Sequence, residues 1–322
     1  MSRPVAELHM HIEGSLEPEL IFELADRNRI DLPYKDMDDL RSRYEFTDLQ
    51  SFLDLYFTNM RVLRTEQDFA DLTRAYFERA AGAGVAHAEV FCNPQAHMAR
   101  GVALETVVDG MADAVASSER DFGLSTSVIA AVLRDRPVGE AADMLGDLLA
   151  MRAPIVGIGL DSAEVGNPPS LFEDVFARAR AEGLHVVAHA GEEGPPEYVW
   201  QALDLLGAER IDHGVRALED PELVRRLVDE EIPLTVCPLS NVRLRVFDSI
   251  EDHPLRRMMD EGLVVTVNSD DPAYFGGYVD DNFEALRGGI DLTDDERDLL
   301  ARNSIRAAFA SDARKAELLA EF

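Results

Sequence analysis

The sequence predicts an α/β fold, a (β/α)8 barrel of the TIM type with extra helices after the first strand and at the carboxyl terminus. Three observations support it: short apolar runs alternate with amphipathic helical stretches, there are eight such runs, and the chain has 322 residues. Alternating strands and helices imply a parallel sheet, because parallel neighbours need a crossover connection. Barrels commonly use a chain of this length as one unit, so we expect a single domain over residues 1–322.

The expected strands are short, rich in β-branched residues and followed by polar or glycine-rich corners. They cover residues 5–8, 85–91, 126–132, 155–160, 185–188, 210–212, 234–237 and 264–267. Apolar residues at helical spacing lie between them, for example over residues 104–118, 171–182 and 221–230. The first connection, residues 14–84, is much longer and predicts several helices, with a break at Pro33. A final helical tail begins near Thr293.

The main alternative fold is a doubly wound open sheet, which typically carries a phosphate-binding Gly-x-Gly-x-x-Gly motif. That motif is missing here, because Gly157 and Gly159 are followed by Leu160, Asp161 and Ser162. No low-complexity linker divides the chain. The barrel is therefore the preferred interpretation.

Composition indicates a globular protein, with 46% hydrophobic and 29% charged residues. No apolar run approaches the roughly 18 residues of a membrane span, and the first residues lack the apolar core of a signal peptide. We therefore expect a cytoplasmic protein. The net charge of −31 argues against nucleic acid or an anionic membrane as partner. This acidity is typical either of a salt-rich cytoplasm or of a general solubility charge, and the sequence does not decide between them.

The two cysteines, Cys92 and Cys237, lie in apolar, strand-like runs, which predicts buried free thiols. Their number excludes a disulfide framework, and no Cys-x-x-Cys motif is present. The sequence gives no sign of an organic cofactor and none of an oligomeric state.

Polar side chains gather where several expected strands end, which is the catalytic edge of such a barrel. His9 and His11 follow the first strand, and alternate residues of an extended chain share one face. His189 directly follows the fifth expected strand, so it is a candidate third ligand beside this histidine pair. Taken alone, a His-x-His pair or a strand-end histidine more often faces solvent or bonds to backbone. Together, three imidazoles are typical of a metal site.

Carboxyl groups and one more histidine complete this constellation. Asp270 and Asp271 follow the eighth strand, where one carboxylate can bind metal and its neighbour can contact substrate. The alternative for these two residues is a helix N-cap or an Asx-turn. Glu192 is placed to act as a general acid or base, and His213 to polarise a water; their alternatives are a solvated acidic loop and a core histidine. The nitrogen-rich, thiolate-free set favours one zinc ion, with iron or cobalt as alternatives.

The remaining histidines have other expected positions. His87 lies within the second strand, His253 in a helix before Pro254, and His185 at the wrong barrel end for catalysis. His97 lies in the loop after the second strand and stays ambiguous.

Four motifs resemble the adenosine/adenine deaminase family of the amidohydrolase superfamily. They are ELHMHIEGSL at residues 7–16, HAGE at 189–192, RIDHG at 210–214 and SDDP at 269–272, and they occur in the order typical of that family. The matches run from residue 5 to about residue 280. The resemblance implies a distorted (β/α)8 barrel and one catalytic zinc ion bound by His9, His11, His189 and Asp270.

The resemblance also implies roles in hydrolytic deamination of an aminopurine. Glu192 matches the residue that shuttles protons to N1, and His213 the residue that orients the attacking water. Asp271 matches the contact to purine N7, and Gly159 the backbone amide that donates to N3. Zinc lowers the pKa of a bound water to near 7, which suits attack at C6.

The position of Glu13 bears on the substrate. Adenosine deaminases usually carry an aspartate there, which contacts the ribose, and the extra methylene of Glu13 is expected to fill the ribose space. The segments EVFCNPQAH at residues 89–97 and NSDDPAYFGGY at 268–278 also look like the adenine deaminase branch. The sequence therefore favours free adenine, converted to hypoxanthine and ammonia in purine salvage.

Alternatives remain open at this point. Related branches act on adenosine, N6-substituted adenines or 6-aminodeoxyfutalosine, and other hydrolases use the same barrel. Binuclear members usually need a bridging lysine, but Lys35 and Lys315 lie away from strand ends. Phe52, Leu55 and Tyr56 are candidates for an apolar wall over the purine, although helical spacing favours a core role.

Overall fold

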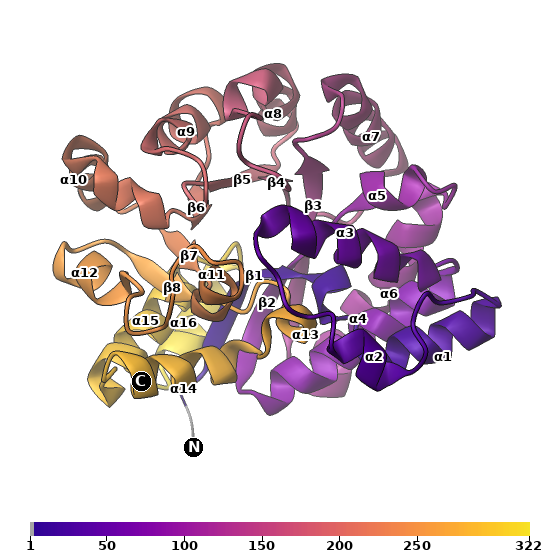
Figure 1. The fold of residues 1–322 in the computed structure, drawn as a ribbon. Coiled ribbons are helices and arrows are strands. Elements are labelled where there is room, and N and C mark those ends of the chain that lie inside the picture. Colours follow the sequence, from indigo (N-terminus) through magenta and orange to yellow (C-terminus); the bar gives the residue numbers. More distant parts are fainter. Residues whose placement is uncertain (1–2) are drawn as a thin grey trace.

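A computed structural model describes residues 3–322 of the chain and confirms the predicted (β/α)8 barrel. Its eight strands form one parallel sheet in the order β1-β2-β3-β4-β5-β6-β7-β8, and helices surround it (Figure 1). The strands are β1 (Val5–His11), β2 (Val85–Cys92), β3 (Ser125–Leu133), β4 (Gly157–Asp161), β5 (His185–Ala190), β6 (Arg210–His213), β7 (Leu234–Val236) and β8 (Val265–Val267).

The α-helices form the outer ring and the additions to it. They are α1 (Pro18–Asn28), α2 (Met37–Arg41), α3 (Leu49–Asn59), α4 (Glu66–Gly82), α5 (Pro94–Met98), α6 (Leu104–Phe122), α7 (Val138–Met151), α8 (Glu173–Ala181), α9 (Pro196–Gln201), α10 (Pro221–Asp229), α11 (Pro238–Arg243), α12 (Leu255–Asp260), α13 (Pro272–Phe275), α14 (Val279–Gly289), α15 (Asp294–Ala307) and α16 (Asp312–Leu319). None of the described helices is both long and apolar enough to span a membrane.

The predicted extra helices are present after β1 and at the carboxyl terminus. Helix α4 begins where Thr65 accepts a hydrogen bond from the backbone N–H of Asp68, and Asp68 bonds back to the Thr65 N–H. Such a capping box satisfies two backbone donors that a helix start otherwise leaves free. Helix α3 places its apolar face, including Phe52 and Tyr56, over the carboxyl end of the barrel. The long first connection therefore forms one wall of the cavity described below.

The first strand is longer than predicted. We expected it to end at Leu8, but it continues through His11. The reason is pairing across the barrel seam, since the His11 N–H donates to Asp270 O (2.9 Å) and the Asp270 N–H to His9 O (3.0 Å). These bonds join β1 to the end of β8, so both histidines lie within a strand whose every residue is buried.

Smaller differences concern the fifth strand and one helix. Strand β5 extends to Ala190 and includes His189, where we expected an end at residue 188. His253 precedes α12 instead of lying in a helix, and it bonds to the Asn241 side chain at 3.2 Å. Cys92 and Cys237 are buried free thiols, as predicted.

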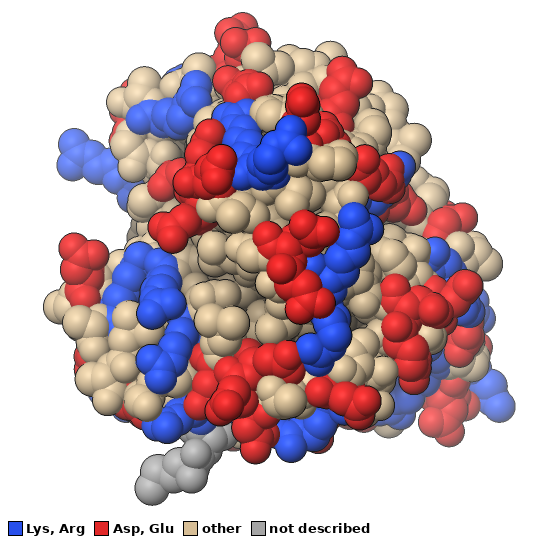
Figure 2. Space-filling model, turned by 90° about the vertical axis from the view of Figure 1, so that its left-hand side faces the viewer, with Lys and Arg blue, Asp and Glu red and all other residues tan. Residues whose placement is uncertain are grey.

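The surface carries acidic and basic side chains side by side. On the face drawn in Figure 2 the two kinds are interspersed. Many arginines form ion pairs, such as Arg79 with Asp280 (3.0 Å) and Arg226 with Asp204 (2.7 Å). This face therefore lacks the continuous basic surface that tracks a nucleic-acid backbone.

Candidate active site and metal centre

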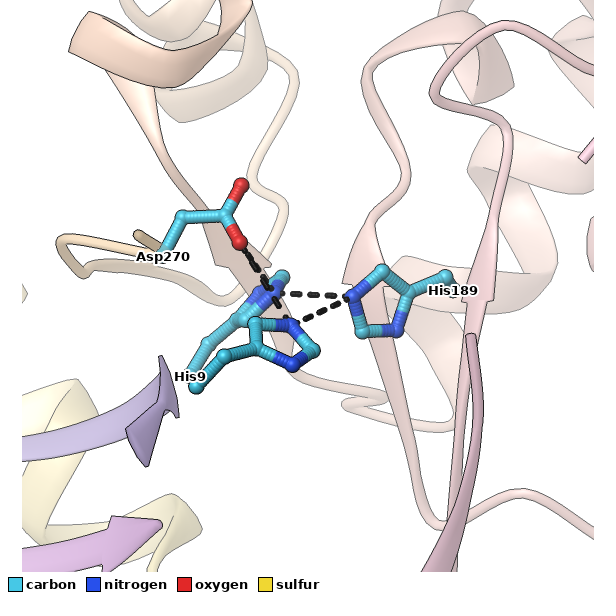
Figure 3. A group of neighbouring side chains, drawn as sticks. His9, His189 and Asp270 are labelled. Atoms are coloured by element: carbon cyan, nitrogen blue, oxygen red, sulfur yellow. Dashed lines mark hydrogen bonds and ion pairs between the residues drawn. The ribbon is translucent and has the colours of Figure 1, made fainter. Parts of the chain in front are cut away.

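Three histidines and one aspartate converge at the carboxyl end of the barrel. His9 and His11 come from β1, His189 from β5, and Asp270 follows β8; ligand atoms of all four lie within 4.8 Å of one another. The Nε2 atom of His189 is 3.0 Å from Nε2 of His9 and 3.2 Å from Nε2 of His11. Figure 3 shows the side chains of His9, His189 and Asp270 pointing toward one another.

The outer nitrogen of each imidazole faces an acceptor. Nδ1 of His9 lies 3.1 Å from the carbonyl oxygen of Thr235, and Nδ1 of His189 lies 3.4 Å from Oδ2 of Asp212. Nδ1 of His11 lies 3.6 Å from Oδ2 of Asp161. These acceptors favour the tautomer with the proton on Nδ1, as they do around metal-bound histidines.

This arrangement fits a metal ion. With the Nδ1 atoms protonated, three Nε2 lone pairs and the Asp270 carboxylate face the same small space, and they repel one another unless a cation lies among them. Burial lowers the pKa of His11 to about 3, and burial together with His9 lowers the pKa of His189. Both imidazoles are therefore neutral at pH 7, the state in which histidine binds metal.

Glu192 and His213 lie beside this cluster without belonging to it. Nε2 of His213 is 3.5 Å from Oε2 of Glu192 and 3.7 Å from Oδ2 of Asp270. Burial, with the charges of Asp270 and Glu164, raises the pKa of Glu192 well above its ordinary value. Its Oε1 atom has no hydrogen-bond partner among the described residues. The raised pKa favours the protonated form of Glu192, which also has a free oxygen and lines the cavity.

The pKa of Asp271 is shifted in the opposite direction from that of its sequence neighbour, Asp270. Burial and the adjacent Asp270 raise the pKa of Asp271 well above normal, whereas His9, His213 and His11 outweigh burial and hold the pKa of Asp270 well below normal. Oδ1 of Asp271 has no partner in the described structure.

Two of the predicted site residues, Glu13 and Gly159, are not among the residues that line the cavity. Glu13 is buried, and its Oε1 accepts hydrogen bonds from His97 Nε2 (2.7 Å) and the Asn93 N–H (3.0 Å) instead of lining the cavity. A buried carboxylate needs such donors, which turn this side chain toward β2. Gly159 lies inside β4, where a Cβ atom would come within 2.6 Å of the Phe91 ring. The structure brings neither residue to the cavity wall.

The cavity has an empty volume of about 430 Å³, part of it open to solvent. Its polar wall contains Asp161, Ser162, Asn93, His11, His189, Glu192, His213, Asp270 and Asp271. Its apolar wall comes largely from α3, so Phe52 and Tyr56 both line the cavity and pack in the core. Leu55 is not part of this wall in the described structure.

Backbone strain marks three of the lining residues. Ser162, His213 and Asp270 have φ angles of 73°, 65° and 64°, the left-handed region that non-glycine residues seldom adopt. Ser162 directly follows β4, His213 is the last residue of β6, and Asp270 lies three residues after the end of β8. Strained residues of this kind concentrate at functional sites, where surrounding contacts hold them in place.

Sequence reasoning missed Glu164 and Asp212. Glu164 accepts the backbone N–H groups of Gly191 (2.7 Å), Glu192 (3.1 Å), Glu193 (2.9 Å) and Gly194 (2.7 Å), so it holds the loop that carries Glu192. Asp212 orients His189 and accepts the Thr235 hydroxyl at 2.7 Å. The signal available for Asp212 was its place in the RIDHG motif, next to His213; no local pattern indicated Glu164.

Fold and site together define a metal-dependent hydrolase of the barrel type, in which four residues able to bind a metal ion lie beside the carboxyl group of Glu192 and the imidazole of His213 at one cavity. The chain belongs to the adenosine deaminase family, which residues 4–322 match.

Comparisons with individual proteins agree with this assignment. A curated adenine deaminase from Streptomyces coelicolor is 57% identical over all of this chain and 95% of its own length. The crystal structure of an adenine deaminase from Arthrobacter aurescens superposes with a TM-score of 0.99 at 65% identity, covering 99% of this chain and 98% of that one. An amidohydrolase structure from Burkholderia ambifaria, described with bound Zn, has a TM-score of 0.91 at 28% identity, covering 99% and 89% of the two chains.

Proposed function

We propose that this protein is an adenine deaminase that hydrolyses adenine to hypoxanthine and ammonia. The observation that carries the proposal is the pairing of a four-ligand metal cluster with a buried, protonated Glu192 in one cavity. Full-length identity above 50% to curated adenine deaminases supports the same reaction.

Zinc is the proposed metal, bound by His9, His11, His189 and Asp270. The three imidazoles and the absence of thiolate from this set suit zinc, and the relative described with bound Zn supports the assignment. When bound, such an ion lowers the pKa of a water molecule and makes it a nucleophile at neutral pH.

The chain's own groups supply the proton transfers. Attack at C6 sends electrons to N1, and the protonated Glu192 delivers a proton there, which stabilises the tetrahedral intermediate. His213, 3.7 Å from Asp270 and 3.5 Å from Glu192, is placed to orient the attacking water between these two carboxyl groups. Asp271, kept protonated by burial, donates to N7 and holds the ring in register.

Free adenine is favoured over adenosine because the curated relatives are adenine deaminases and because buried polar side chains such as Asn93 and Asp161 line the cavity. Glu13 contributes to this wall by holding Asn93, which faces the cavity. Glu13 therefore acts on the cavity indirectly, through Asn93. We propose that this contact is how its longer side chain excludes the ribose.

The test is ammonia release by zinc-loaded protein, with adenine and adenosine supplied side by side at equal concentration. Turnover of adenine with little turnover of adenosine is the expected result. Equal turnover of both would remove the proposed selectivity, and turnover of neither would overturn adenine deamination while leaving the metal cluster in place.

A further inference from the structure

Three carboxyl groups from three different strand ends face the cavity, each with an oxygen that has no hydrogen-bond partner in the described structure. They are Glu192 after β5, Asp271 after β8 and Asp161 at the end of β4. The proposed function uses the first two, at the N1 and N7 edges of the purine. Asp161 has no role in that reaction.

The orientation of Asp161 is fixed by its neighbours. Its Oδ2 accepts a hydrogen bond from Nδ2 of Asn93 at 2.6 Å and lies 3.6 Å from Nδ1 of His11. Asn93 is itself anchored, because its N–H donates to Glu13 (3.0 Å) and its Oδ1 accepts the Tyr56 hydroxyl (3.2 Å). Oδ1 of Asp161 is therefore the oxygen left for a ligand, in a side chain that is only 3% exposed. Burial, with the charge of Glu13, raises the pKa of Asp161 while this oxygen lacks a donor, and an N–H from a ligand would favour the ionised form.

The position of Asp161 matches the far edge of the purine. N1 and N7 flank C6, whereas N3 lies across the six-membered ring from C6 and N9 lies next to that edge. Asp161 stands beside Nδ1 of His11, the ring nitrogen that points away from the ligand cluster. With N1 at Glu192 and N7 at Asp271, as the proposed function has them, the N3–N9 edge of the purine faces the part of the cavity wall that these two residues do not form, and Asp161 belongs to that wall.

We propose that Asp161, oriented by Asn93, is the specificity-determining residue that accepts a hydrogen bond from the N9–H of adenine. The inference rests on the proposed function and names how the same site selects the free base. A nucleoside has no hydrogen at N9, so its binding leaves a buried oxygen unpaired beside carbon. Sites built to bond an N–H reject the analogue that lacks it by factors of about 10⁴–10⁵.

The sharpest variant is Asp161→Asn. Because Asn93 donates at 2.6 Å to Oδ2, an asparagine at position 161 places its amide oxygen there and turns its NH2 group into the cavity. The acceptor for N9–H becomes a donor that opposes it. We expect kcat/KM for adenine to fall on the order of 100-fold. The value for 9-methyladenine, which carries no N9–H, should fall by less than about tenfold.

The readout is the ratio of kcat/KM for adenine to that for 9-methyladenine, measured on wild type and variant and normalised to bound zinc. Wild type should favour adenine by at least about 100-fold. This comparison uses the wild-type protein alone, so it does not depend on whether a variant folds. Asp143→Asn, the same change at an exposed site on α7, should leave the ratio unchanged.

Each contrary outcome has its own meaning. Equal losses on both substrates would overturn the role of Asp161 while adenine deamination by wild type stands. A wild-type protein that discriminates strongly against 3-deazaadenine but not against 9-methyladenine would make Asp161 a donor to N3 and also overturn the proposal. Failure of wild type to deaminate adenine would refute the proposed function itself.

Discussion

Glu192→Gln tests the proposed mechanism most directly. The substitution keeps the size of the side chain and removes the proton that Glu192 delivers to N1. Its N–H remains bonded to Glu164, so the loop should stay in place. General acid–base groups typically contribute about 10²–10⁴ in rate, so we expect kcat to fall on the order of 10³-fold, about 4 kcal/mol of barrier.

The pH dependence gives a second, independent readout. The active form of Glu192 is protonated, and burial with Asp270 and Glu164 raises its pKa. Activity governed by this group is therefore present below the raised pKa and lost as pH rises through it. In Glu192→Gln this alkaline limb should disappear from the pH profile of kcat/KM, because the amide does not titrate.

The assay is ammonia release from adenine, with zinc content measured on the same samples. Glu193→Gln is the matched control, since its carboxyl is the next residue in the loop but lies outside the cavity wall. Full zinc content with kcat near the wild-type value in Glu192→Gln would remove Glu192 from the mechanism. Loss of zinc in that variant would instead assign Glu192 a role in holding the metal site.

Three further outcomes follow from contacts around the site. Asp212→Asn should weaken zinc affinity by about 10–100-fold, measured by competition with a chelator, because it orients His189. Glu164→Gln should lower kcat with zinc content unchanged, because an amide NH2 would face backbone N–H groups that now share one carboxylate; unchanged kcat would deny that positioning role. Glu89→Gln should destabilise the fold by about 3–5 kcal/mol, measured by urea unfolding, because it leaves the buried Arg210 uncompensated (Arg210 to Glu89, 2.6 Å).

The pKa of Glu89 also predicts how the free energy of unfolding depends on pH. Burial opposes its charge, but Arg210 and His87 outweigh burial and lower its pKa in the folded protein. A depressed folded pKa means that the stabilisation is present above the unfolded value of about 4.3 and is lost as pH falls through the folded value. That loss on acidification should be absent in Glu89→Gln.

Period-two alternation in a strand made the ligand cluster predictable. His9 and His11 share a face in any extended segment, and strand ends of a parallel barrel meet at one edge. The same reasoning could not extend β1 through His11, because that extension depends on bonds to Asp270, 259 residues away in sequence (270 − 11). The role of Glu13 was predicted from the family resemblance, and only the folded chain shows that His97 and Asn93 bind its carboxylate.

Local motifs also gave no indication of the residues that orient other side chains and loops. Glu164 bonds to four consecutive backbone N–H groups of a loop about 30 residues further on, and Asn93 connects Glu13 to Asp161 across two strands. Such contacts join carboxyl or amide groups to backbone or side-chain groups that are distant in the sequence. No fixed sequence spacing therefore predicts them. Gly159 is the opposite case. Its short glycine motif predicted a ligand contact, and the structure shows that a side chain at this position would collide with the Phe91 ring.

The charge states of neighbouring carboxyl groups connect the metal site to substrate recognition. Asp270 lies among histidines that hold its pKa well below normal, so it is an anion suited to a metal. Burial is the largest cause that raises the pKa of Asp271 and of Glu192, which favours their protonated forms, and the proposed mechanism uses them as donors to the N7 and N1 lone pairs of a purine. If all three were anions, two of them would repel the ring nitrogens that they face. Burial therefore separates two candidate donors from the ionised ligand Asp270, which is how environments that separate pKa values assign acid and ligand roles.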